Sequence, residues 1–135
     1  MGVLGFQRRP SELAELQACA AVGQSRLMAI YEKLFARFDL LATPTTATVA
    51  FTAEGPLPFE VEGRAVETPG GGIAFTYPFN FSGNPAVSLR AGFNDERLPV
   101  GLQLIAPRLR EDLLLQVARQ YEQVRPWRTE WPTLA

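Results

Sequence analysis

Two short apolar runs separated by a polar turn constrain the fold of this chain more than any other feature. The runs cover residues 86–91 and 100–106, and the turn between them covers residues 94–97. Apolar segments of this length around a polar tip are typical of two strands joined in a hairpin. Pro85 disfavours helix just before the first run, and Gly101 in the second indicates a bulge or the close approach of another backbone. We therefore predict that this strand pair is the centre of the fold.

Helical patterns flank the strand pair on both sides. Small and apolar residues recur at steps of three and four from Leu13 to Phe38, which predicts an amphipathic helix over about residues 12–37 that Ser11 can cap. We expect Gly23, on its apolar face, to mark close packing. A second amphipathic helix is predicted over about residues 110–123.

The segment between the first helix and the strand pair is less regular. Residues 39–44 have the composition of a short buried strand that ends at a proline. Residues 44–72 lack a sustained period, and we interpret them as an exposed excursion with a small hairpin at 59–66. A short helix over 75–82 then leads to the first strand of the pair.

These elements predict a single α/β domain, with a partial mixed sheet flanked by a long N-terminal helix and a C-terminal helix. Its parts are a helical arm, the strands with the excursion at 44–72, and a C-terminal helix with a tail, over residues 1–38, 39–107 and 108–135.

Composition excludes several classes of function. The net charge of −1 supplies no field to recruit nucleic acid or an anionic membrane. The chain has no histidine, so histidine-based catalytic triads are excluded, and we expect neither a metal nor a cofactor. No apolar run approaches the length of a membrane span, and we see no secretory signal. A single cysteine, Cys19, cannot form an internal disulfide, which favours a cytoplasmic location.

Two motifs in the central stretch resemble the amidase signature family. Residues 80–88 have the form Asn-x-x-Gly-x-Pro-Ala-x-Ser, and residues 98–103 follow as Leu-Pro-x-Gly-x-Gln. Their order and spacing are similar to the C-terminal part of that family, and the resemblance extends from residues 38–45 through the last helix. It implies a correspondence to about the last third of such an enzyme, with four structural motif positions at Asn80, Gly83, Pro85 and Gly101.

The resemblance also implies a chemistry that this chain cannot complete. Enzymes of the family hydrolyse amides with a serine nucleophile, a second serine in a cis peptide and a lysine. The only lysine here is Lys33, on a predicted surface helix, and none of the four serines lies in a Gly/Ser-rich signature. No catalytic residue is therefore assigned.

The run before Asn80 is the candidate substrate pocket. In the family these residues help to line the acyl pocket, and the amidotransferases of the family carry an aspartate seven positions before the asparagine, where this chain has Ile73. An apolar side chain cannot pair with an ammonium group, so a glutamine-like substrate is disfavoured. The resemblance implies an apolar pocket, with core packing as the alternative, for Ile73, Thr76, Tyr77 and Phe79.

The sequence thus predicts the C-terminal portion of an amidase-type hydrolase that supplies scaffold and part of a pocket wall. Its expected partner is the missing N-terminal portion or a second copy, and a small amide is its substrate only in the complete enzyme. A stand-alone, non-catalytic binding or assembly module is the alternative. Such a module covers its sheet edges and apolar faces, whereas a piece of a larger fold leaves them open.

Overall fold

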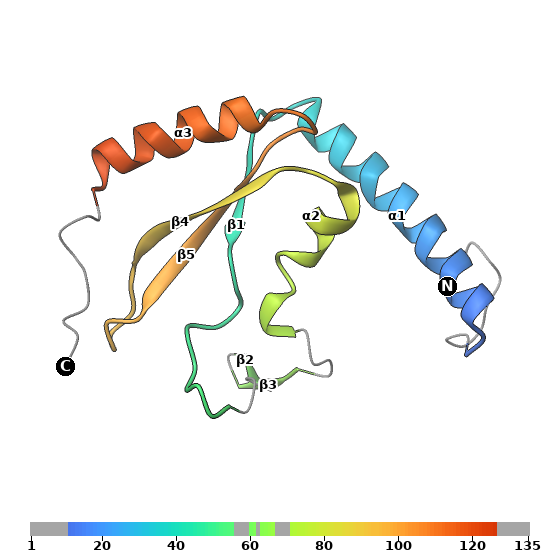
Figure 1. Ribbon diagram of the computed structural model, residues 1–135, viewed down its shortest axis with the longest axis horizontal. Coiled ribbons are helices and arrows are strands. Elements are labelled where there is room, and N and C mark those ends of the chain that lie inside the picture. The colour runs from blue at the N-terminus through green and yellow to red at the C-terminus, as the bar shows by residue number, and fades with distance from the viewer. Residues whose placement is uncertain (1–10, 56–59, 62, 67–70, 127–135) are drawn as a thin grey trace.

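A three-stranded sheet lies at the centre of the structure (Figure 1), a computed structural model that describes residues 11–55, 60–61, 63–66 and 71–126. The strands are β1 (Leu41–Pro44), β4 (Ala86–Phe93) and β5 (Pro99–Ile105), in the order β1-β5-β4. The strand pair expected at 86–106 is therefore confirmed, and β5 is the central strand. The α/β class is confirmed too, but both strand pairings are antiparallel where we expected a mixed sheet.

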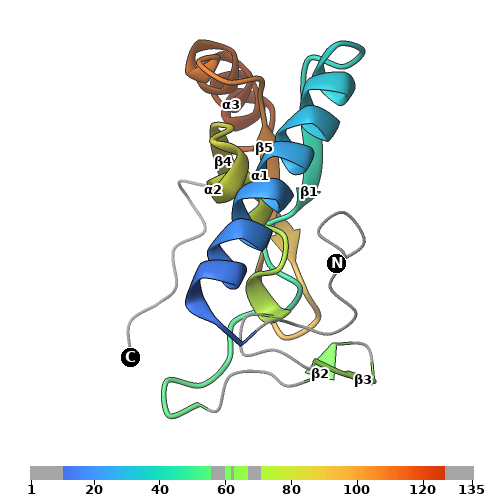
Figure 2. The same ribbon diagram turned by 90° about the vertical axis from the view of Figure 1, so that its right-hand side faces the viewer.

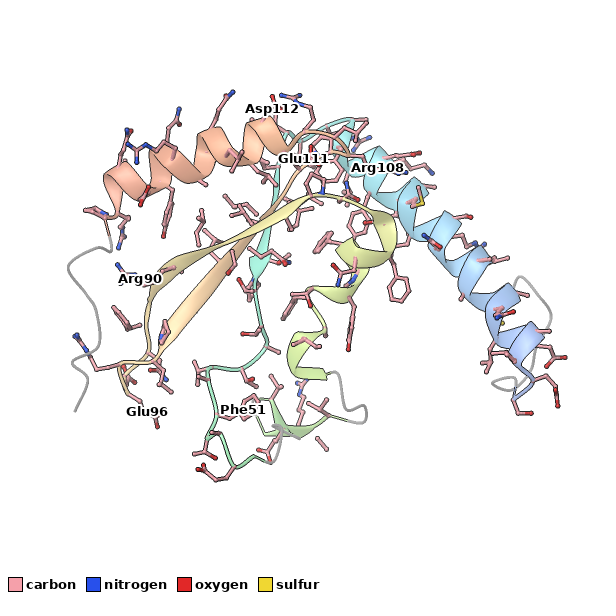
Figure 3. The ribbon with its side chains drawn as sticks, viewed as in Figure 1. Phe51, Arg90, Glu96, Arg108, Glu111 and Asp112 are labelled. Atoms are coloured by element: carbon pink, nitrogen blue, oxygen red, sulfur yellow. The ribbon has the colours of Figure 1, made fainter. Side chains whose placement is uncertain are left out.

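The turn between β4 and β5 explains why this pair is antiparallel. The side-chain oxygen of Asn94 accepts hydrogen bonds from the backbone N–H groups of Glu96 (3.1 Å) and Leu98 (2.8 Å), which closes a tight reversal. Glu96 lies at the exposed tip of this hairpin (Figure 3). Strands joined by so short a connection can only pair antiparallel.

Helix α3 (Glu111–Val124) covers one face of the sheet. Leu114 is buried against Leu104 and Ala106, and Val87 and Leu102 pack around them. At the far end of β4, the Tyr121 hydroxyl donates to the Arg90 carbonyl (2.9 Å), beside a register shift between Arg90 and Gly92. The helix thus packs on the sheet and also holds the irregular end of its edge strand.

Helix α1 (Leu13–Phe35) matches the predicted helix to within two residues at each end, yet it contains no buried residue. Ser11 does not cap it, because Glu12 takes the N-cap position without a side-chain hydrogen bond. The prediction of close packing at Gly23 is also wrong, since no atom beyond its chain neighbours and its own helix backbone lies within 4 Å of the position that a Cβ would take. Figure 1 shows α1 leading away from the sheet, with its C-terminal end nearest to β1.

The excursion forms a small structure of its own. Strands β2 (Glu60–Val61) and β3 (Arg64–Ala65) pair antiparallel around Gly63, whose φ of 75° suits glycine, so the predicted hairpin is confirmed. Two views show it at the end of the molecule opposite α3 (Figures 1 and 2). Residues 1–10 of the helical arm, residues 127–135 of the tail and several positions of the excursion lie outside the described residues.

A 3₁₀ turn, η1 (Gly71–Ile73), and helix α2 (Tyr77–Ser82) return the chain from the excursion to β4. Gly83 ends α2 in the left-handed conformation, with φ of 70°, and its N–H binds the Phe79 carbonyl. A side chain at position 83 would be strained in this conformation. The glycine of the first motif therefore lets α2 stop and β4 begin within a few residues.

Candidate functional site

The sheet face opposite α3 is polar in its middle, although Ile105 at the end of β5 is fully buried on the same face. Successive side chains of a strand alternate between faces, so Leu102 and Leu104 turn toward α3 while Gly101 and Gln103 belong to the other face. Thr43 and Ser88 are the register partners of Gln103 on β1 and β4. We call this surface the polar sheet face, which consists of Thr43, Thr45, Ser88, Gly101 and Gln103.

Gly101 leaves room for two hydroxyl groups to meet across the central strand. Thr45 Oγ1 and Ser88 Oγ lie 2.7 Å apart and share a hydrogen bond. A Cβ on Gly101 would lie 2.6 Å from Thr45 Oγ1 and 2.9 Å from Thr45 Cβ. The close approach expected at Gly101 is present, although a side chain rather than a backbone makes it.

Gln103 connects the sheet to the segment that precedes α2. Its side chain is buried, and the residue is only 4% exposed. Its Nε2 donates to Thr43 Oγ1 (3.0 Å) and to the backbone carbonyl of Phe75 (3.0 Å). A buried carboxamide needs such partners, because an unmade hydrogen bond there is costly. The sequence motif contained this glutamine, but nothing in its pattern indicated that it contacts the candidate pocket segment.

The four candidate pocket residues share one short segment but differ in their surroundings. Ile73 and Tyr77 are 42% and 44% exposed, whereas Phe79 is 6% exposed and its ring lies 5.1 Å from that of Tyr31. The Thr76 hydroxyl donates to the Ile73 carbonyl (2.9 Å) and so closes the turn before α2. Phe79 is thus buried as the core-packing alternative predicts, while Ile73 and Tyr77 are exposed and available to a ligand or to another chain.

A cavity of about 460 Å³ adjoins the polar sheet face. Phe75 contributes to it from the candidate pocket segment, and Gly101 contributes from β5. Thr46 and Thr48 add hydroxyl groups, and the Thr46 hydroxyl donates to the Thr48 carbonyl (2.7 Å). Sequence reasoning missed Phe75, Thr46 and Thr48, because two of them lie in the irregular excursion, where no period shows which side chains converge.

The first motif also joins α2 to the end of the sheet. The Pro85 carbonyl accepts a hydrogen bond from the Ala106 N–H (3.1 Å), and the Asn84 side chain donates to the Ala106 carbonyl (2.9 Å). Asn80 is exposed within α2. The side-chain bond at this junction therefore comes from Asn84, which sequence reasoning did not single out.

A second cavity, of about 350 Å³, lies between α1, the end of α2 and the link from β5 to α3. Tyr31, Ser82 and Arg108 are among its lining residues, and Figure 3 shows Arg108 near the end of α1. Partial burial raises the pKa of the Tyr31 hydroxyl above its ordinary value. The Tyr31 phenol therefore stays uncharged at neutral pH, in a cavity that Arg108 also lines.

Charge at the start of α3 is paired locally. Arg110 Nε lies 2.9 Å from Asp112 Oδ1, and this hydrogen bond lowers the pKa of the Asp112 carboxyl. The same contact raises the pKa of Arg110. Acidic side chains in the first turn of a helix are also favoured by its dipole. The pair therefore stabilises the start of α3 and has no role at the polar sheet face.

Lys33 and the serine hydroxyls have separate surroundings in the described chain. Lys33 is exposed in the last turn of α1, and Ser25 donates to a carbonyl of its own helix. Ser82 is buried with its hydroxyl on the Phe79 carbonyl, while Ser88 is engaged with Thr45. Within the described part of the chain, no three His, Cys, Asp or Glu residues form a metal-like cluster, and no helix is long and apolar enough to cross a membrane.

Comparisons with known proteins agree on one family. The amidase family model matches residues 6–115. The A subunit of a glutamyl-tRNA(Gln) amidotransferase from Picosynechococcus sp. is 40% identical over an alignment of 108 residues, which covers 77% of this chain and 20% of that protein. An acylamidase from Rhodococcus erythropolis is 38% identical over 95 residues, or 70% of this chain and 20% of the relative.

Solved structures give the same result. A bacterial aryl acylamidase of the amidase signature family superposes with a TM-score of 0.75 at 28% identity, over 88% of this chain and 24% of that one. A 6-aminohexanoate cyclic dimer hydrolase superposes with a TM-score of 0.67 at 34% identity, over 90% of this chain and 26% of that one. The chain spans about one fifth of the length of the curated relatives that it matches. With the family model matching most of its length and both motifs placed around one sheet, the chain belongs to the amidase signature family.

Proposed function

We propose that this chain is the C-terminal portion of an amidase-type hydrolase, which cleaves amide bonds by a Ser-Ser-Lys mechanism in the complete enzyme. The observation that carries this proposal is the family match over residues 6–115 in a chain that spans one fifth of its relatives. The chain supplies scaffold and part of the acyl pocket and lacks the catalytic triad. Two observations support the last point: Lys33 is exposed in the last turn of α1, and the hydroxyls of Ser82 and Ser88 are bonded to the Phe79 carbonyl and to Thr45.

The proposed substrate is a small amide with an apolar acyl part. Ile73 occupies the position where the amidotransferase pattern has an aspartate, and it cannot pair with the amino group of glutamine. The cavity beside Phe75, Val100 and Gly101 is lined by apolar groups and a few hydroxyls. Such a lining favours an uncharged ligand over a charged amino acid.

The proposed partner is the N-terminal portion of the same fold, with self-association as the other way to cover the open surfaces. Ile30 and Phe38 are each 55% exposed near the C-terminal end of α1. Strand β4 is an edge of the sheet, and an open edge accepts another strand. These open surfaces favour a piece of a larger fold over a stand-alone module. Cytoplasmic location and the absence of nucleic-acid and membrane partners stay predictions.

The proposal is tested by assaying the purified chain against a panel of small amides and esters, including anilides. We expect no hydrolysis above the buffer rate, because walls without a nucleophile and a base have no reaction to accelerate. The double variant Ser82→Ala/Ser88→Ala is the matched control, and it should give the same background. Turnover by the chain, whether or not it survives in the control, would contradict the proposal.

A further inference from the structure

We propose that Gln103 is a positioning residue, whose carboxamide holds the segment 73–79 in place against the polar sheet face. This inference rests on the proposed function, because that segment is the candidate wall of the acyl pocket. Gln103 itself touches the wall through the Phe75 backbone, and its 4% exposure leaves little of it for a ligand. It therefore acts through the segment and not on the substrate.

The geometry of the carboxamide supports this role. The amide nitrogen has two hydrogens, and two acceptors lie 3.0 Å away: Thr43 Oγ1 on β1 and the carbonyl of Phe75. One planar group thus joins the central strand, an edge strand and the pocket segment. Apolar replacements would leave the Phe75 carbonyl without its donor, and a carboxylate would repel it.

The segment has few other ties to the sheet region, which makes the Gln103 bond consequential. The Ala47 N–H binds the Gly72 carbonyl (2.9 Å) just before it. The Thr76 N–H and hydroxyl both bind the Ile73 carbonyl, so these two bonds stay inside the segment. Phe79 anchors the far end against Tyr31. Between these two anchors, the Phe75 carbonyl is held to the sheet by Gln103.

The test compares Gln103→Glu with Gln120→Glu in the isolated chain. Both variants exchange an amide for a carboxyl, but Gln120 is exposed on α3. The measurement is backbone hydrogen exchange by NMR, expressed as protection relative to the intrinsic rate. The amides of Thr76, Phe79 and Asn80 report on the segment, and the Ala106 amide reports on the sheet.

We expect protection in the segment to fall about ten-fold in Gln103→Glu at about pH 9, where the carboxyl is ionised, with Ala106 unchanged. At about pH 4 the neutral acid regains one O–H donor, so protection should return toward the wild-type value. Burial raises the pKa of such a carboxyl, so the loss appears as pH rises through that raised value. Gln103→Met, which has no donor at any pH, should show no recovery.

Three results would overturn the inference. They are equal protection of the segment in Gln103→Glu and Gln120→Glu, a uniform loss that includes Ala106, and a loss that does not recover in acid. A uniform loss would make Gln103 part of the general core instead of a positioning residue. Because this measurement needs no substrate, its failure is distinguishable from a failure of the activity assay.

Discussion

Helices α1 and α3 are both amphipathic in sequence, but they have different relations to the sheet. Helix α3, with 14 residues, buries Leu114 to 4% exposure against the strands. Helix α1, with 23 residues, buries none, and Ile30 on it remains 55% exposed. The difference shows that an apolar stripe in the sequence identifies which face of a helix needs a packing partner, but not which part of the structure that partner is.

The connections to the sheet explain this difference. Helix α3 follows the central strand β5 after a short link at 106–110, so the chain folds directly back over the sheet (Figure 1). Helix α1 precedes β1, an edge strand of only four residues, and its main neighbour is α2. In this chain the helix attached to the edge strand leads away from the sheet, whereas the helix attached to the central strand packs across it.

The strongest test of the comparison removes the same kind of side chain from each helix. Leu114→Ala should lower the free energy of unfolding by about 2–5 kcal/mol, because it leaves a cavity under α3. Ile30→Ala, on the exposed side of α1, should change it by less than about 0.5 kcal/mol. Urea denaturation followed by circular dichroism measures both. Similar losses for the two variants would show that α1 is packed as tightly as α3.

A smaller effect is expected at Gly101, where the sheet can be compared with the excursion. Gly101→Val should cost about 1–3 kcal/mol, because the added side chain overlaps the Thr45 side chain under the Thr45–Ser88 hydrogen bond. Glu60→Ala, on an exposed position of β2, should cost less than about 0.5 kcal/mol. Equal denaturation midpoints would mean that the strands around Gly101 are not the centre of the fold.

The smallest free-energy effect is expected for association through α1. We expect the isolated chain to self-associate at concentrations of tens of micromolar, roughly the range where weak interfaces form, because the apolar side chains of Ile30 and Phe38 stay exposed. Ile30→Asp should reduce the mass measured by light scattering without lowering stability by more than about 1 kcal/mol. Leu115→Asp is the control, since Leu115 is 68% exposed on α3. A monomeric wild-type chain, or an equal loss of mass in both variants, would argue against association through α1.

Much of the local structure was predictable from the sequence. The 3.6-residue period located α1 and α3, and turn residues located the β4–β5 hairpin and the hairpin around Gly63. Gly101 was correctly singled out as a position of close approach. Close packing at Gly23 was wrong, because the argument assumed that an apolar helix face is always covered.

The candidate site was predictable only in part. The family resemblance singled out Ile73, Thr76, Tyr77 and Phe79 of the segment 73–79, but it is Phe75 that lines the cavity and contacts Gln103 through its carbonyl. Neither fact follows from a pattern, because the contact joins positions 28 residues apart through a backbone atom. Side-chain identity carries no information about which backbone carbonyl lies nearby.

The sequence by itself determined the elements, their apolar faces and the family motifs, since these depend on residues close together along the chain. The tertiary structure alone decided that β1 pairs antiparallel with β5, that Thr45 and Ser88 meet over Gly101, and that Gln103 donates to the Phe75 carbonyl. The physical reason is the distance along the chain over which each interaction acts. Propensity and period act over a few residues, whereas register and long-range hydrogen bonds depend on how distant segments pack.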